Sequence, residues 1–304
     1  MRRGRHLITA LATLCFMASG CARLGLAEPS PARTGPDPAT AIAVSVLSDA
    51  VYLVDPATGV SEQVASGLAN FQAGYAVWSP GHQLLAYGDG GIVVLDPRTG
   101  ERRVAAAGPS LSMAAWNGDG TQLAYGNGTA LFVSVLGSTR PASLRLPGTL
   151  APFGMDWAPG SAIAFEGLQL DCSRGANCSS TDRSDIWTIR PDGSGLRRLT
   201  RVGGALGPKW SPDGSSLLFL RRYPGAKVAR TELWVVQADG SGMRMLTSAT
   251  DVLAADWSPD GTQIAMVRAG TLPNSLQLWI VSADGSAARM VGDEVPGSAA
   301  TVSW

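Results

Sequence analysis

A tryptophan followed by Ser-Pro-Asp-Gly occurs twice in this chain, at Trp210 and Trp257, and diluted copies begin at Trp78, Trp116 and Trp157. The final residue is Trp304, and successive tryptophans of the series lie 38, 41, 53, 47 and 47 residues apart. A self-similar unit of about 40 to 50 residues is typical of solenoids and propellers. This repeat therefore constrains the fold more than any other feature of the sequence.

Each repeat is interpreted as four strands joined by turns. In the clearest copy the expected strands run from Pro208 to Ser211, Ser216 to Leu220, Glu232 to Gln237 and Met243 to Leu246. The connecting sequences are Ser-Pro-Asp-Gly and Asp-Gly. Proline presets the first dihedral angle of a turn and glycine accepts the positive φ that completes it, so both connections predict hairpins.

The third strand of each clear repeat is almost continuously apolar. It runs Ile186-Trp187-Thr188-Ile189, then Leu233-Trp234-Val235-Val236, then Leu278-Trp279-Ile280-Val281. A short, unbroken apolar strand is covered on both faces. Small sheets stacked face to face around an axis provide that cover and leave only short edges, as in a propeller.

The two ends of the chain complement each other. Residues 51–59 repeat as residues 92–100, so residues 41–66 provide strands two to four of a blade whose first strand is missing. Thr301-Val302-Ser303-Trp304 is a first strand with nothing after it. We therefore predict an all-β, six-bladed β-propeller over residues 41–304, with four-stranded antiparallel blades and N-terminal strands that pair with the C-terminal strand.

The first residues have the pattern of an export signal. A basic start is followed by the apolar run Leu7 to Met17 and by Ala18-Ser19-Gly20 before Cys21. Small residues directly before a cysteine resemble a bacterial lipobox, so residues 1–20 are predicted to be a lipoprotein signal peptide. Residues 21–40 would be a lipidated Cys21 and a proline-rich tether. The expected location is the outside of a bacterial membrane, anchored by lipid. Because Ala18 stands where leucine is commonest, ordinary secretion is the alternative.

Two cysteines lie six residues apart, at Cys172 and Cys178. An exported protein meets an oxidising compartment, where such a pair can close a small loop. A metal site would need further ligands, and no histidine is near. We predict a disulfide, with two free thiols as the alternative.

The sequence Trp-Ser-Pro-Asp-Gly, the strand Leu-Trp-Val-Val and the segment 238–247, Ala-Asp-Gly-Ser-Gly-Met-Arg-Met-Leu-Thr, resemble the WD40-like repeats of the TolB propeller family. The resemblance extends over residues 41–304. It implies a six-bladed propeller and a protein-docking role in the bacterial envelope. The family carries an α/β domain before its propeller, and we expect a leader and tether there instead, so a TolB role is not itself implied.

Several function classes are disfavoured. The 24 basic residues are balanced by 24 acidic ones, whereas nucleic-acid binding favours a basic surplus. There is no Gly-x-Ser-x-Gly motif, and His82 is the single histidine after the leader. Oligogalacturonate lyases also use TolB-like propellers, and resemblance to them would imply a histidine-rich metal site in the channel. We expect no catalytic residues, no cofactor, no metal and no nucleic-acid partner, and the Asp-Gly pairs are interpreted as turns.

Loop length distinguishes the two faces of the predicted ring. Long insertions at residues 167–184, 221–231 and 269–275 all follow second strands and therefore emerge on one face. Binding residues concentrate on loops held by a rigid scaffold. On this face the candidate partner-binding residues are Arg221, Arg222, Tyr223, Lys227 and Arg230, with a solvated loop as the alternative. We expect a monomeric, non-catalytic module that binds an envelope or secreted protein. The alternative is a glycan-binding or glycan-processing site at the channel mouth.

Overall fold

The computed structural model describes residues 35–46, 50–66, 75–108, 111–160, 162–173, 178–223, 230–297 and 300–304. The predicted signal peptide, Cys21 and most of the tether lie outside these residues, as does Lys227. Within the described ranges there is no helix long and apolar enough to cross a membrane.

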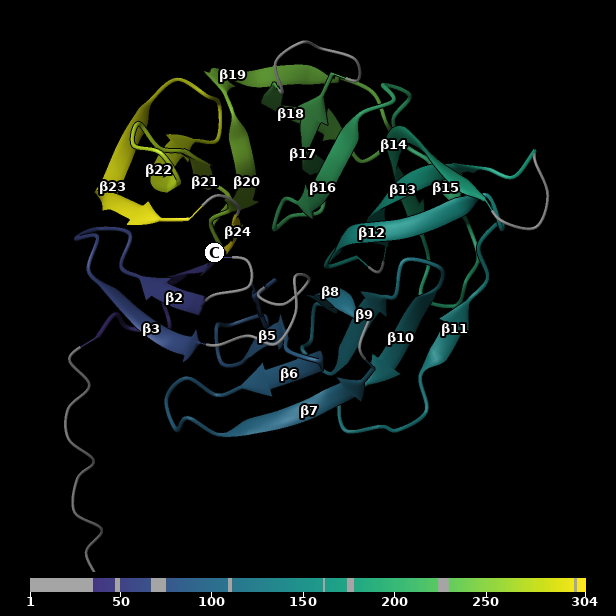
Figure 1. Cartoon of the computed structure of the whole chain (residues 1–304), viewed down its shortest axis with the longest axis horizontal. Coiled ribbons are helices and arrows are strands. Elements are labelled where there is room, and N and C mark those ends of the chain that lie inside the picture. The colour runs from purple at the N-terminus through teal and green to yellow at the C-terminus, as the bar shows by residue number, and fades with distance from the viewer. Residues whose placement is uncertain are drawn as a thin grey trace, which may run out of the picture. The chain divides into compact units, whose positions relative to one another are not determined.

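Residues 35–304 form six four-stranded antiparallel sheets arranged around a common axis (Figure 1). The first strands, nearest the axis, are β24 (Ala300–Ser303), β4 (Val77–Trp78), β8 (Ser112–Trp116), β12 (Leu150–Trp157), β16 (Ala205–Trp210) and β20 (Val252–Trp257). The second strands are β1 (Ile42–Val46), β5 (Leu85–Gly88), β9 (Gln122–Gly126), β13 (Ile163–Asp171), β17 (Ser216–Arg222) and β21 (Gln263–Ala269).

The outer half of each sheet is built in the same way. The third strands are β2 (Ala50–Val54), β6 (Gly91–Leu95), β10 (Leu131–Val135), β14 (Ser179–Ile189), β18 (Thr231–Gln237) and β22 (Ser275–Ser282). The fourth strands are β3 (Ser61–Ser66), β7 (Arg102–Ala107), β11 (Ala142–Leu144), β15 (Arg197–Arg198), β19 (Arg244–Thr250) and β23 (Ala288–Pro296). The predicted all-β, six-bladed fold is confirmed.

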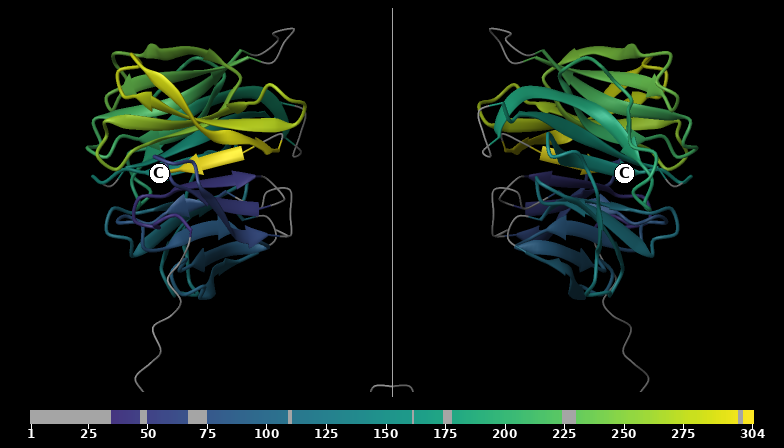
Figure 2. Two further views of the ribbon diagram at one scale, coloured as in Figure 1. Left: turned by 90° about the vertical axis from the view of Figure 1, so that its left-hand side faces the viewer. Right: turned by 90° about the vertical axis from the view of Figure 1, so that its right-hand side faces the viewer.

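The ring closes as the sequence predicts. Strand β24 pairs with β1, in a register that places Val302 opposite Val44 and Ala300 opposite Val46. Figure 2 shows the short yellow C-terminal strand beside the purple N-terminal strands. Val302 is buried and packs with the sheet of β20 to β23, so the sheet β24-β1-β2-β3, here the closing sheet, joins both ends of the chain.

The hydrophobic core lies between neighbouring sheets. Along β18, Leu233 packs in the cluster shared with β20 and β21, whereas Val236 packs in the cluster shared with β13 and β14. Three of the repeat tryptophans, Trp78, Trp116 and Trp257, also donate indole hydrogen bonds to a neighbouring sheet or to the segment before it. The indole N–H of Trp78 donates to the carbonyl of Ala41 at 3.0 Å, and that of Trp257 donates to the carbonyl of Lys209 at 3.2 Å. The repeat tryptophans therefore pack and align the blades.

The Asp-Gly turns obey the expected turn chemistry. The Asp213 carboxylate accepts hydrogen bonds from the Ser211 hydroxyl and, at 3.0 Å, from the Ser215 N–H. These bonds, with that of Ser211 the largest influence, lower the pKa of Asp213 to about 2. Gly214 has a φ of 69°, which a residue with a Cβ adopts only at a cost.

Two further segments bear on the predictions. Cys172 and Cys178 form the predicted disulfide at the tip of the β13–β14 hairpin, with Cα atoms 4.2 Å apart. Residues 35–40, assigned from sequence to the tether, form a turn in which Pro36 and Pro38 are buried. These residues belong to the same compact unit as the six sheets.

Candidate functional site

The two faces of the ring differ in their connections. Turns after first and third strands are short and form one face, which we call the short-hairpin face. Hairpins after second strands and the links between sheets form the opposite, loop-rich face, where the disulfide-closed β13–β14 hairpin lies. First strands begin at the loop-rich face, so their N-terminal residues surround the axial channel there.

Four neighbouring first strands are irregular at their N-terminal halves. Their pairing with the second strands shifts register at Met113 in β8, Gly154 in β12, Gly207 and Pro208 in β16, and Leu253 in β20. Such β-bulges bend a strand and redirect side chains, and they are common beside binding sites. Met113 has a φ of 51°, an uncommon conformation for a residue with a side chain.

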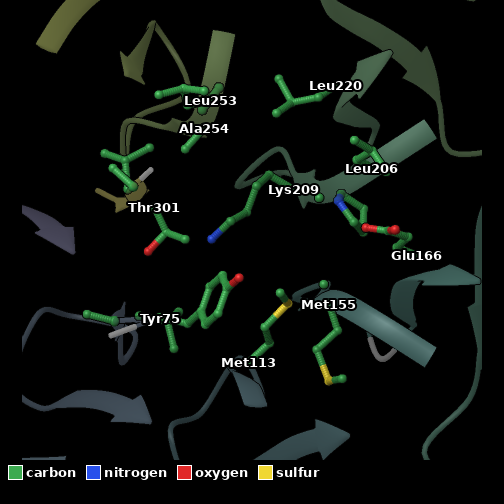
Figure 3. A pocket seen from close by; sticks show the side chains of 18 of the residues that line it. Tyr75, Met113, Met155, Glu166, Leu206, Lys209, Leu220, Leu253, Ala254 and Thr301 are labelled. Atoms are coloured by element: carbon green, nitrogen blue, oxygen red, sulfur yellow. The ribbon is translucent and has the colours of Figure 1, made fainter. Parts of the chain in front are cut away.

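These bulges surround a cavity of about 290 Å³ at the channel mouth of the loop-rich face, here the channel-mouth cavity (Figure 3). Most of its wall is apolar. The lining includes Met113, Met155, Leu206, Leu220, Leu253, Ala254, Ala255 and Val302, with the polar side chains of Tyr75, Glu166, Lys209 and Thr301. In Figure 3 the Tyr75 ring and the Lys209 side chain point toward the middle, and Glu166 stands at the wall near Leu206.

Glu166 is the acidic group of this wall. It lies on β13 opposite Phe153, and the Gly207 N–H donates a hydrogen bond to its carboxylate. Burial raises the pKa of Glu166 to about 7, since the Gly207 hydrogen bond and the charge of Arg222 offset only part of the desolvation. Burial, and then the charge of Glu166, also raises the pKa of Tyr75.

Lys209 forms the floor of the cavity, where it is flanked by two carboxylates. Its ammonium Nζ donates to Asp256 at 3.2 Å. Asp156 accepts the Trp210 N–H at 2.6 Å, and Asp256 accepts the Trp304 N–H at 3.3 Å. Burial raises the pKa of Asp156 despite the opposing charge of Lys209. Burial alone would lower the pKa of Lys209, but the two carboxylates outweigh it and raise that pKa.

No motif of the sequence identifies the group formed by Asp156, Lys209 and Asp256, but the positions of these residues in the repeats do. Asp156, Lys209 and Asp256 each stand directly before a repeat tryptophan. Because that position lines the channel in five of the six copies, aligning the repeats would have brought the three together. A second hollow, of about 300 Å³, lies beyond this group on the short-hairpin face.

Three of the five predicted partner-binding residues have partners within the protein. The Arg221 guanidinium lies 4.8 Å from the ring centre of Tyr223 and 4.7 Å from that of Trp234. The Tyr223 hydroxyl donates to Glu232 at 2.8 Å, and Arg230 pairs with the same carboxylate at 2.6 Å. The predicted basic patch is therefore partly an internal cluster at the base of the β17–β18 hairpin.

The charge interactions within this cluster indicate that its residues stabilise the fold. Burial alone would raise the pKa of Glu232, but hydrogen bonds from Tyr223 and Trp234 and the charge of Arg230 lower it overall. The Arg222 guanidinium forms no hydrogen bond or ion pair with any other described residue. Among the predicted partner-binding residues that the structure describes, Arg222 is thus the cation whose hydrogen-bond donors are free to bind a partner on the loop-rich face.

We expect Arg221→Ala to lower the free energy of unfolding by about 1 to 2 kcal/mol, because Tyr223 and Trp234 lose a cation held between their rings. Arg222→Ala is the matched variant, with the same change in charge, and should alter stability by less than about 0.5 kcal/mol. Urea denaturation of both variants measures this. Equal losses would contradict the internal assignment of Arg221.

His82, the single histidine after the predicted leader, lies on the short-hairpin face. Its ring stacks on Trp78 with centroids 5.0 Å apart. Burial lowers its pKa, so the ring is neutral at pH 7. Across the described part of the chain, no three His, Cys, Asp or Glu side chains are grouped closely enough to hold a metal ion.

No protein-family model and no curated protein matches the sequence. Solved structures do. TolB from Acinetobacter baumannii superposes with a TM-score of 0.67 and 17% identity, over 88% of this chain and 67% of that one. A chain of a nidogen/laminin complex superposes with a TM-score of 0.64 and 14% identity, over 86% of this chain and 97% of that one. An oligogalacturonate lyase in complex with manganese superposes with a TM-score of 0.53 and 18% identity, over 80% of this chain and 70% of that one. The chain therefore has the TolB-like six-bladed β-propeller fold.

Proposed function

We propose that this protein is a non-catalytic, protein-binding module of the bacterial cell envelope, which binds its partner through the loop-rich face. One observation carries the proposal: bulges in four neighbouring first strands open an apolar cavity at the centre of that face. A concave, mainly apolar recess on a rigid scaffold is a common form of binding site. The surrounding hairpins extend the surface that a partner can contact.

The arrangement of titratable groups favours binding over catalysis. Acid–base catalysis needs groups that can give and take a proton at the reacting atoms. In the described wall of the cavity Glu166 is the one carboxyl group, and the Lys209 ammonium is engaged by Asp256. Asp156 is similarly engaged by the backbone of the next blade. These groups join blades, which supports a rigid, non-catalytic scaffold.

Three features support the envelope assignment. The N-terminal sequence has the pattern of an export signal ending at Cys21, which would carry the lipid anchor. The Cys172–Cys178 disulfide suits an oxidising compartment outside the cytoplasm. The fold is that of TolB.

The glycan alternative receives less support from the cavity. A bound sugar presents many hydroxyl groups, and each loses hydrogen bonds with water unless the site replaces them. The side chains of this wall are mainly Met, Leu and Ala. An apolar group of a partner suits such a wall better than a carbohydrate does.

Site-specific photocrosslinking in the native cell tests the proposed face. Leu272, 65% exposed, lies on the loop-rich face, and Val60, 53% exposed, lies on the short-hairpin face, so the two are matched apolar positions. A photoreactive phenylalanine at position 272 should give one crosslinked envelope protein, and the same residue at position 60 should give none. Crosslinks from position 60 alone would overturn the proposed face, and crosslinked glycan at position 272 would favour the alternative.

A further inference from the structure

The charges around the channel do not balance. Among the described residues that line its two hollows, the charged groups are three carboxyls, on Glu166, Asp156 and Asp256, and one ammonium, on Lys209. Lys209 lies between the two aspartates and is hydrogen-bonded to Asp256 at 3.2 Å. The charge of Arg222 acts on Glu166, but Glu166 is the carboxyl group of the channel that forms no hydrogen bond or ion pair with a cationic side chain among the described residues.

Glu166 is also poorly solvated. Its hydrogen-bond donor in the described part of the chain is a single backbone group, the N–H of Gly207. The neighbouring backbone at Gly154 comes close, because a Cβ added there would lie 3.6 Å from the Glu166 carboxylate and 3.4 Å from the Cα of Gly207. An ionised carboxylate in apolar surroundings is unfavourable unless an opposite charge accompanies it. The wall therefore favours a ligand that carries a positive charge.

We propose that the channel-mouth cavity binds a small amphipathic organic cation, a protonated amine on an apolar body, with the ammonium group placed against Glu166. This inference goes beyond the protein-binding role and is independent of it. The apolar body would lie on Met113, Met155 and Leu253, which form the wall around the bulges. The Tyr75 ring points into the same space and offers its face to a cation (Figure 3).

The strain at Met113 supports a binding role for this wall. A positive φ is unfavourable for a residue with a Cβ, and such residues cluster at ligand sites. The bulge places the Met113 thioether close to Gly154, so that a Cβ added to this glycine would lie 3.4 Å from the sulfur. A flexible, polarizable side chain at this point can adapt to ligands of different shape.

The pH dependence of binding follows from Glu166. The groups whose charge acts on it or that share its cavity are Arg222 on β17, Lys209 on β16 and Tyr75 before β4. An alkylammonium ion keeps its proton below about pH 10, as lysine does. Because the pKa of Glu166 is about 7, the carboxylate is mostly protonated at pH 6 and mostly ionised at pH 8.5. Affinity should therefore be roughly tenfold higher at pH 8.5 than at pH 6.

Isothermal titration calorimetry of the full chain in amine-free buffer tests the proposal with n-hexylamine, n-hexanol and hexanoate. We expect n-hexylamine to bind at least tenfold more tightly than n-hexanol at pH 8.5, and hexanoate to bind least. Glu166→Gln should remove that preference while n-hexanol binding persists. Glu101→Gln, at an exposed turn of the short-hairpin face, is the matched control and should leave all affinities unchanged.

The comparison of n-hexylamine with n-hexanol is made in the native protein, so it tests the proposal whether or not Glu166→Gln folds well. Equal affinities for n-hexylamine and n-hexanol, or an amine affinity that does not change between pH 6 and 8.5, would overturn the proposal. So would failure of n-hexylamine to bind the native protein at all. None of these results bears on crosslinking from position 272, so the two proposals can fail separately.

Discussion

Deletion of residues 300–304 is expected to abolish cooperative folding of the whole propeller. Strand β24 provides the first strand of the closing sheet and contributes Ala300 and Val302 to the core that this sheet shares with the sheet of β20 to β23. Without it, the apolar face of β1 and the facing core are exposed together. A loss of more than about 5 kcal/mol is expected, which equals the whole stability of many domains. Thermal unfolding followed by circular dichroism should show no cooperative transition.

Two reciprocal substitutions in β24 provide the control. Val302 is 2% exposed in the core, and its replacement by threonine buries a hydroxyl group, at a cost of about 1 to 3 kcal/mol. The hydroxyl of Thr301 makes no hydrogen bond to another described residue, so Thr301→Val should be neutral or stabilising. If the truncated chain unfolds at the temperature of the full chain, or if the two substitutions have the same effect, closure by β24 does not stabilise the ring.

Lys209→Met is expected to lower the free energy of unfolding by about 3 to 5 kcal/mol at pH 7, because it leaves Asp156 and Asp256 as buried charges without a cation. Burial already raises the pKa of Asp156, and loss of the opposing charge of Lys209 would raise it further above its unfolded value. A group of that kind stabilises the fold fully below its unfolded pKa, near pH 4, and the contribution is lost as pH rises. The penalty should therefore shrink between pH 7 and pH 4, as measured by urea denaturation at both pH values.

A second substitution separates charge from packing. In Lys209→Met/Asp256→Asn one carboxylate is removed, so we expect the double variant to recover at least half of the lost stability at pH 7. Asp256→Asn alone should cost less than Lys209→Met, since the ammonium keeps Asp156 nearby. A pH-independent penalty in the single variant would show that the methylene chain of Lys209, and not its charge, holds the blades together.

Much of the site was beyond prediction from single residues. The basic residues around Arg221 were expected on the loop-rich face, and the structure shows in addition that Arg221, Tyr223 and Arg230 contact Trp234 and Glu232 of the same sheet. A run of cations in a sequence does not show whether its charges meet solvent or a buried carboxylate. Glu166 belongs to no motif, and its neighbours Phe165 and Gly167 give no sign of a site.

The sequence by itself determined the number of blades, their four-stranded pattern, the closure by both termini and the disulfide. These features depend on local turn chemistry, on period and on spacing, all of which are written along the chain. Only the tertiary structure decided where the bulges fall, that their backbones open a cavity, and that Glu166 makes no ion pair while Lys209 lies between two aspartates. Those properties arise from side chains on different blades, some 50 residues apart, such as Asp156, Lys209 and Asp256. Their charge states follow from burial, which no single strand specifies.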